Sequence, residues 1–123
     1  MTSPQMIENQ NALDQYIDLL GDEGVEFIVD IIDTFLEDAP NNWRQIQESM
    51  AAKDHVTFRR ASHTLKTGCA TVGATTLSEK FLAMEKAGAA NNILSVQSLM
   101  DRCKVELTLL ARELVSKKKS LQS

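Results

Sequence analysis

The chain has 123 residues, of which 43% are hydrophobic and 24% are charged, values typical of one globular domain and not of a disordered chain. Five glycines, two prolines and 5% aromatic residues disfavour a barrel or sandwich of many short strands. The net charge of −4 is unevenly distributed. Residues 1–43 contain ten acids and no lysine or arginine, whereas residues 44–123 contain thirteen bases and seven acids.

The apolar period of the first half predicts three consecutive helices. The first is short, ends at Gly21, and has an apolar stripe of Leu13, Tyr16, Ile17 and Leu20. The second covers residues 25–36, with a stripe of Val25, Ile28, Val29, Ile32, Phe35 and Leu36. Pro40 suits the first turn of a third helix, whose inner face is Trp43, Ile46 and Met50.

Three more helices are predicted in the second half. Asp54 is a suitable N-cap for a helix that runs to about Val72, and Gly73 then permits a turn. The capping box Thr76-x-x-Glu79 opens the next helix, with a stripe of Leu77, Phe81 and Met84. After a break at residues 91–92, the last helix has a stripe of Ile93, Val96, Met100, Cys103, Leu107, Leu110 and Leu114.

Long amphipathic helices with short connections predict an all-α fold. We expect an antiparallel four-helix bundle with one or two additional short helices packed at its N-terminal side. Residues 1–123 form one domain in this interpretation, with an ordered bundle over about residues 11–116. Residues 117–123 begin with three lysines and are expected to form a frayed basic tail.

Several classes of protein are disfavoured by the sequence. No apolar run approaches the roughly 18 residues of a membrane span, and Met1-Thr2-Ser3-Pro4 lacks the basic start of a signal peptide, so we expect a cytoplasmic protein without membrane contact. No basic stripe alternates with aromatic residues, so we expect no nucleic-acid partner. Cys69 and Cys103 lie on apolar stripes and are predicted to be buried, reduced thiols.

The helix over residues 54–72 contains the most informative side chains. At about 100° per residue its buried face comprises Phe58, Ala61, Ser62, Leu65, Cys69 and Val72. His63 lies about 140° from Phe58, away from this face. Three cations lie within one turn of it, namely Arg59, Arg60 and Lys66. A neutral imidazole has a lone pair that can accept a phosphoryl group, and nearby cations offset its negative charge. On spacing alone, however, a lone surface histidine more often has no chemical role.

Other catalytic arrangements are absent from the sequence. His55 lies near the start of the same helix and is expected at its boundary or surface. The two histidines are eight residues apart with no carboxylate at ligand spacing, so we expect no metal site. The sequence has no P-loop, nucleophile elbow or Gly-rich ATP-binding segment. We therefore expect no cofactor and no complete enzyme, and any phosphate must come from another protein.

The segment over residues 63–74, HTLKTGCATVGA, resembles the signature of histidine-containing phosphotransfer (HPt) domains, H-x-L-K-G followed by a second glycine before the next helix. Residues 35–40, FLEDAP, are similar to that family's F-L-x-D-x-P segment. The spacing from Leu77 to Glu85 is similar to its L-x-x-x-x-x-x-x-E pattern. Together these segments span most of residues 13–90, at the separations expected for the whole domain.

The resemblance implies a role for each of several residues. His63 is the phosphoacceptor, phosphorylated at Nε2. Lys66 helps to hold the phosphoryl oxygens, and Glu85 orients the ring through Nδ1. The positions of Arg59 and Arg60 on the helix, apart from the resemblance, add positive charge that offsets the phosphoryl group. Gly73 ends the helix, and Gly68 is the second structural glycine. The implied partners are the receiver domain of a sensor (hybrid) histidine kinase and the receiver domain of a response regulator. We expect the carrier itself to be a monomer.

One position departs from the family pattern. The glycine expected one turn after the histidine is Thr67 here, and Gly68 is displaced by one residue, which reduces the clearance beside His63. We expect a docking surface around His63 formed by Val56, Thr67 and Ala70, together with Leu13 or Ile17. Two alternatives stay open: an HPt-like module that binds receivers without carrying phosphate, and a helical adaptor outside signalling.

Overall fold

The structure is a computed structural model and describes residues 5–123. Met1–Pro4, part of the basis for the expectation about a signal peptide, lie outside the described residues. The helices are α1 (Asn11–Leu20), α2 (Asp22–Ala52), α3 (His55–Thr71), α4 (Thr75–Ala89) and α5 (Gln97–Gln122), with a short 3-10 helix, η1, over Ile93–Val96. Over this range the chain has no strand, so the predicted all-α class is confirmed. None of the helices in residues 5–123 is long and apolar enough to cross a membrane.

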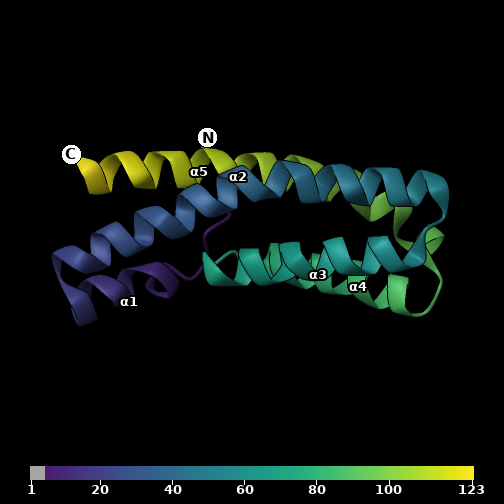
Figure 1. Cartoon of the computed structure of the whole chain (residues 1–123), viewed down its shortest axis with the longest axis horizontal. Helices are drawn as coiled ribbons and strands as arrows, with labels where there is room; N and C mark the ends of the chain where they lie inside the picture. The colour runs from purple at the N-terminus through teal and green to yellow at the C-terminus, as the bar shows by residue number, and fades with distance from the viewer. Residues whose placement is uncertain (1–4) are drawn as a thin grey trace.

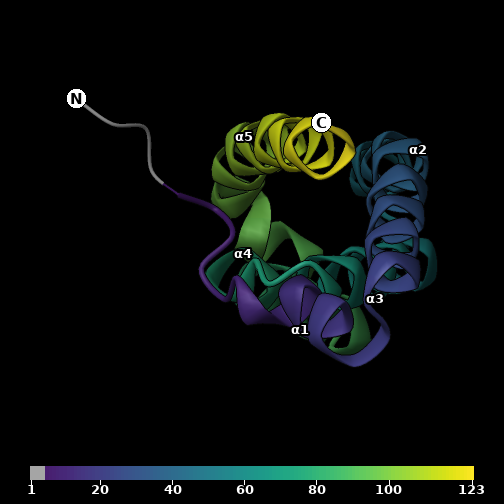
Figure 2. The same cartoon turned by 90° about the vertical axis from the view of Figure 1, so that its left-hand side faces the viewer.

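The four long helices surround a common apolar centre. In Figure 1, α2 and α5 form one layer and α3 and α4 the other, and successive long helices run in opposite directions. Figure 2 shows the same four helices end-on, with α1 lying across one end of the bundle near α3. Side chains from all four long helices are buried in the centre, among them Ile32, Phe58, Phe81 and Leu110. The predicted antiparallel four-helix bundle with a short N-terminal helix is therefore confirmed.

One prediction about the first half is wrong, because the expected second and third helices form the single helix α2. Pro40 lies inside this helix and not in a first turn. A proline in a helix interior costs about 3 kcal/mol, since it donates no backbone hydrogen bond and crowds the preceding turn. The face formed by Phe35, Ala39 and Trp43 is buried on both sides of Pro40, and its continuous packing offsets that cost.

The ends of α3 follow the prediction. Asp54 caps the helix, because its carboxylate accepts a hydrogen bond from the backbone N–H of Thr57 at 3.1 Å. Gly73 lies just after the helix with φ at +89°, a conformation that favours glycine. A Cβ atom at this position would also lie 2.2 Å from the carbonyl oxygen of Asn9, so only glycine fits.

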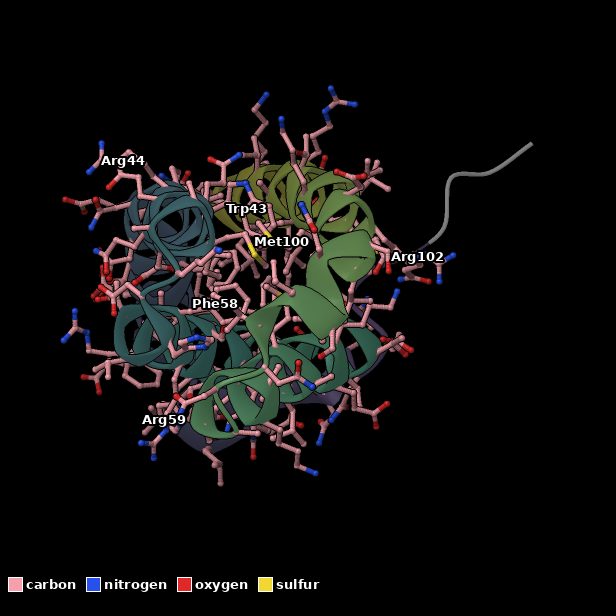
Figure 3. The ribbon with its side chains drawn as sticks, turned by 90° about the vertical axis from the view of Figure 1, so that its right-hand side faces the viewer. Trp43, Arg44, Phe58, Arg59, Met100 and Arg102 are labelled. Carbon is pink, nitrogen blue, oxygen red and sulfur yellow. The ribbon has the colours of Figure 1, made fainter. Side chains whose placement is uncertain are left out.

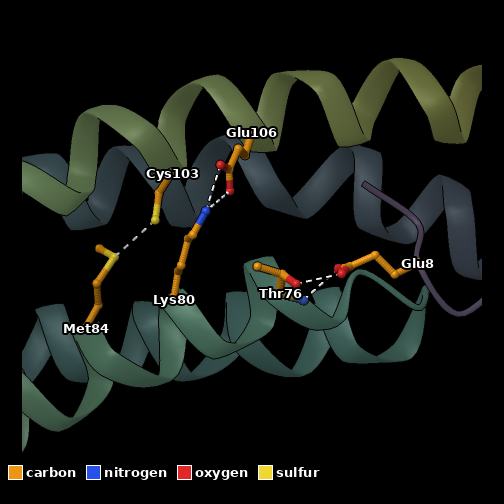
Figure 4. Close-up of polar contacts among 6 residues, drawn as sticks. All are labelled: Glu8, Thr76, Lys80, Met84, Cys103 and Glu106. Atoms are coloured by element: carbon orange, nitrogen blue, oxygen red, sulfur yellow. Dashed lines mark hydrogen bonds and ion pairs between the residues drawn. The ribbon is translucent and has the colours of Figure 1, made fainter. Parts of the chain in front are cut away.

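The start of α4 differs from the prediction, because the expected capping box does not form. The helix begins at Thr75, and the carboxylate of Glu8 binds the backbone N–H of Thr76 at 2.7 Å and its hydroxyl at 2.6 Å (Figure 4). These two hydrogen bonds hold the pKa of Glu8 below its ordinary value. The N-terminal segment thus caps a helix 68 residues further along the chain.

The two cysteines are buried in the core as free thiols, as predicted. Burial raises the pKa of Cys69 to about 12 and that of Cys103 to about 11, so both stay protonated at neutral pH. The sulfur of Cys103 lies 3.8 Å from the sulfur of Met84 across the α4–α5 contact (Figure 4). Both thiols therefore act as packing groups.

The prediction of a frayed tail from residue 117 is wrong, because α5 continues to Gln122. The Nζ atom of Lys117 lies 2.7 Å from a carboxylate oxygen of Asp14 on α1, and that of Lys118 lies 2.6 Å from a carboxylate oxygen of Asp33 on α2. Leu121 is partly buried against the core. The basic end of the chain is ordered because it packs on the acidic helices α1 and α2.

We predict that the double substitution Lys117→Gln, Lys118→Gln lowers the free energy of unfolding by about 1 kcal/mol, since it removes two partly exposed ion pairs. The loss should shrink in 1 M salt, which screens such pairs. Chemical denaturation at low and high salt measures both effects. Lys119→Gln is the control, because Lys119 is exposed and forms no ion pair with any residue of the described range. Equal stability of the double variant and the wild type would contradict the role given to these pairs.

Candidate functional site

His63 lies on the exposed side of α3, with 57% of its side chain accessible to solvent. The opposite side of the helix is buried through Phe58, Ala61, Ser62, Leu65 and Cys69, as the helical period predicts. The ring therefore stands on a rigid helix whose inner face is fixed by the core. A histidine in this position can be reached by a second protein without any opening of the bundle.

Glu85 on α4 joins His63 and Lys66. One carboxylate oxygen lies 2.8 Å from Nδ1 of His63, and the other lies 2.8 Å from Nζ of Lys66. The close contact with Lys66, followed by the hydrogen bond from His63, holds the pKa of Glu85 below its ordinary value in spite of partial burial. The carboxylate is therefore ionised at neutral pH and only accepts hydrogen bonds.

This contact selects the tautomer of His63. Because an ionised carboxylate has no proton to donate, Nδ1 of His63 carries the proton in the hydrogen bond to Glu85. The lone pair of the neutral ring then lies on Nε2. The arrangement prepares Nε2 as a nucleophile and leaves Nδ1 engaged.

The contact depends on the close approach of α3 and α4. A Cβ atom at Gly88 would lie only 2.8 Å from Cβ and 2.9 Å from Cα of Arg59, so no larger residue fits there without a shift of the helices. The hydroxyl of Ser78 also donates a hydrogen bond to the carbonyl oxygen of Lys66 at 2.9 Å. Sequence reasoning missed Gly88, and the only available signal was a glycine inside a predicted amphipathic helix.

The three cations around His63 differ in their contacts. Lys66 is bound to Glu85 and its side chain is only 25% exposed. Arg59 and Arg60 are exposed and form no ion pair within residues 5–123. With His63, both arginines line a depression of about 330 Å³ that Glu85 and Val56 complete. Figure 3 shows Arg59 directed away from the bundle. The charges of both arginines are therefore exposed to solvent beside His63.

The expected docking residues are only partly at the surface. Val56 is 73% exposed, and Thr67 and Ala70 are also exposed on the His63 side of α3. Ile17 is half-buried. Leu13 is only 1% exposed and belongs to the core, so its inclusion in a docking surface is wrong. Leu13 belongs to the apolar stripe of α1, and this stripe packs against the core and not toward His63.

The remaining predicted residues have structural positions. A Cβ atom at Gly68 would lie 3.2 Å from two ring carbons of Phe35, so this glycine lets α2 approach α3 closely. His55 is the first residue of α3 and is half-buried. Among residues 5–123, no three histidine, cysteine, aspartate or glutamate side chains are grouped so that they could hold a metal ion.

The fold and the exposed histidine together define the class of protein. The Hpt domain family model matches residues 30–115, which is well over half of the chain. The chain therefore belongs to the Hpt domain family, the phosphoryl carriers of two-component phosphorelays.

Comparison with solved structures supports the fold. The chain is similar in fold to histidine-containing phosphotransfer protein B (HptB) from Pseudomonas aeruginosa PAO1, with a TM-score of 0.80 and 18% sequence identity. The match covers 96% of this chain and 98% of that one. No curated protein sequence matches the chain.

We predict that Glu85→Gln lowers stability at neutral pH by about 1 kcal/mol, because it removes a partly buried charge pair. A carboxyl whose pKa is lowered on folding stabilises the fold above its unfolded pKa, and this contribution disappears as the pH falls through the folded pKa. The difference between variant and wild type should therefore shrink steadily as the pH falls below the ordinary pKa of a glutamate, about 4.3.

Denaturation midpoints over this pH range check the prediction. Glu79→Gln is the matched control, because Glu79 is exposed on the same helix and pairs with no cation in the described part of the chain. A difference that stays constant with pH would show that Glu85 stabilises the fold by something other than its charge.

Proposed function

We propose that this protein carries a phosphoryl group on Nε2 of His63 between two receiver domains. The donor is the phosphorylated aspartate of the receiver domain of a sensor (hybrid) histidine kinase. The acceptor is the aspartate of a response-regulator receiver domain. The observation that carries the proposal is the hydrogen bond from Nδ1 of an exposed His63 to the ionised carboxylate of Glu85.

The transfer needs little chemistry from the carrier. The lone pair of Nε2 forms the N–P bond while the P–O bond to the donor aspartate breaks and its electron pair returns to that carboxylate. The Nδ1 proton stays in the hydrogen bond with Glu85, and this carboxylate offsets the positive charge that develops on the ring. The metal ion and catalytic acids of the reaction belong to the receiver domain.

The surroundings of His63 suit an approach by a second protein. Arg59 and Arg60 supply unpaired positive charge, which favours the phosphoryl group and the acidic groups that hold it in the donor. On the same side of α3, Thr67 and Ala70 are small and leave room for the loops of a receiver domain. We therefore place the docking surface around His63 on Val56, Thr67 and Ala70, the exposed residues on this side of α3.

We predict that a phosphorylated receiver domain labels the wild type with a phosphate that is acid-labile and stable in base, as a phosphoramidate is. His63→Gln should acquire no label, because the accepting nitrogen is lost. The matched control is His55→Gln, which removes the other histidine and should be labelled like the wild type. Autoradiography after acid or base treatment measures the result.

The same experiment separates the alternatives. Label on His63→Gln with the same stability would disprove the assignment of the phosphoacceptor. Binding of the receiver without transfer would support a module that only docks receivers. Neither binding nor transfer would support a helical adaptor.

We predict that Thr67→Gln folds normally but slows transfer by about tenfold or more, because a longer side chain displaces the receiver from its in-line position. Quenching mixtures of phosphorylated receiver and carrier at successive times gives the rate of phosphoryl transfer, and circular dichroism checks the fold. Thr108→Gln makes the same change at an exposed position of α5 and should leave the rate unchanged. A wild-type rate for Thr67→Gln would place the docking surface elsewhere.

A further inference from the structure

Lys66 is the cation that the family resemblance assigns to the phosphoryl oxygens, yet in the unphosphorylated protein it is already engaged. Its Nζ lies 2.8 Å from one carboxylate oxygen of Glu85, and the ion pair is mostly shielded, with side-chain exposures of 25% and 17%. The other oxygen of the same carboxylate holds Nδ1 of His63. A single group on α4 therefore binds both the ring and its neighbouring cation.

We propose that Glu85 is a positioning residue that withholds Lys66 until His63 is phosphorylated and then releases it to the phosphoryl group. The inference rests on the proposed function. It adds that the contribution of Lys66 to phosphoryl carriage depends on the charge of Glu85.

Two changes upon phosphorylation favour the release. The phosphoryl group adds a charge of roughly −2 beside the ring, more than the single charge of the carboxylate that holds Lys66. Lys66 lies three residues after His63, so the two side chains are neighbours on one face of α3, and the lysine stem is flexible enough to reorient. The N–P bond also withdraws electrons from the ring, which makes the Nδ1–H a stronger hydrogen-bond donor. Glu85 then binds the ring more strongly, and its contact with Lys66 becomes easier to replace.

Lys66 and the two arginines therefore have different roles. In the resting protein, Arg59 and Arg60 carry the unpaired positive charge that a partner meets first. Lys66 favours the phosphorylated state only by the difference between its contact with the phosphoryl group and its contact with Glu85. Removing the charge of Glu85 weakens the competing contact, because an amide oxygen attracts the lysine less than a carboxylate does. Lys66 should then stabilise the phosphorylated state more strongly.

A double-mutant cycle tests this dependence. The equilibrium between phosphorylated receiver and phosphorylated His63 is measured for the wild type, Lys66→Gln, Glu85→Gln and the double variant. With Glu85 present, Lys66→Gln should lower the ratio of phosphohistidine to phosphoaspartate by about twofold. In the Glu85→Gln background, the same change should lower this ratio by about tenfold, a coupling of about fivefold. An equal effect of Lys66→Gln in both backgrounds would overturn the inference.

A matched ion pair controls for loosening of α4. Lys80 on this helix pairs with Glu106 on α5, with side-chain exposures of 19% each, and the pair does not contact His63 (Figure 4). Lys80→Gln and Glu106→Gln should each leave the phosphoryl equilibrium unchanged. A shift as large as that of Glu85→Gln would reduce the role of Glu85 to holding the helix, which would also overturn the inference.

A second measurement needs no phosphorylation. Carbon-detected NMR titration should show that Lys66→Gln raises the pKa of Glu85 more than His63→Gln does, because Lys66 brings a full positive charge to 2.8 Å from the carboxylate, whereas the Nδ1–H of a neutral ring brings none. The reverse order would overturn the inference while leaving the carrier function intact. Failure of the wild type to accept a phosphoryl group would instead remove the proposed function, and the inference with it.

Discussion

The close packing of α3 against α4 is the constraint on which the site depends. Gly88 lets the two backbones approach to a distance that a side chain would prevent, since a Cβ atom there would lie only 2.8 Å from Cβ of Arg59. One turn earlier on the same helix, Glu85 reaches His63. Without this contact, no group of the described structure would hold the proton on Nδ1 and leave the lone pair on Nε2.

The uneven distribution of charge serves the fold as well as the site. Asp14 on α1 and Asp33 on α2 form ion pairs with Lys117 and Lys118 at the basic end of α5. These pairs neutralise positive charge at that end of the bundle. Lys80 and Glu106 form a further internal pair between α4 and α5. Arg59 and Arg60 are left unpaired in the described structure, close to the exposed histidine. The net charge is −10 over residues 1–43 and +6 over residues 44–123. Part of this excess of positive charge stays available beside His63, where a phosphoryl group would be held.

Local rules predicted the helices and their faces, and long-range contacts explain where those rules failed. The cap at Asp54 and the exposed face of α3 need only a few neighbouring residues, and both were predictable. Pro40 locally favours a break, but burial on both sides of it decides the outcome. The cap supplied by Glu8 to Thr76 joins residues 68 apart, which no local pattern reveals. In the site, resemblance to the family indicated Glu85, whereas its shared contact with Lys66 required the packing of two helices.

The proposed carriage of a phosphoryl group on Nε2 of His63 is tested most directly by NMR of the phosphorylated protein, which can identify the atom that is modified. A spectrum that correlates ¹⁵N, ¹H and ³¹P shows which ring nitrogen of His63 is bound to phosphorus and which bears hydrogen. We expect phosphorus on Nε2 and a hydrogen-bonded proton on Nδ1, facing Glu85. Phosphorus on Nδ1, or on a side chain other than His63, would contradict it.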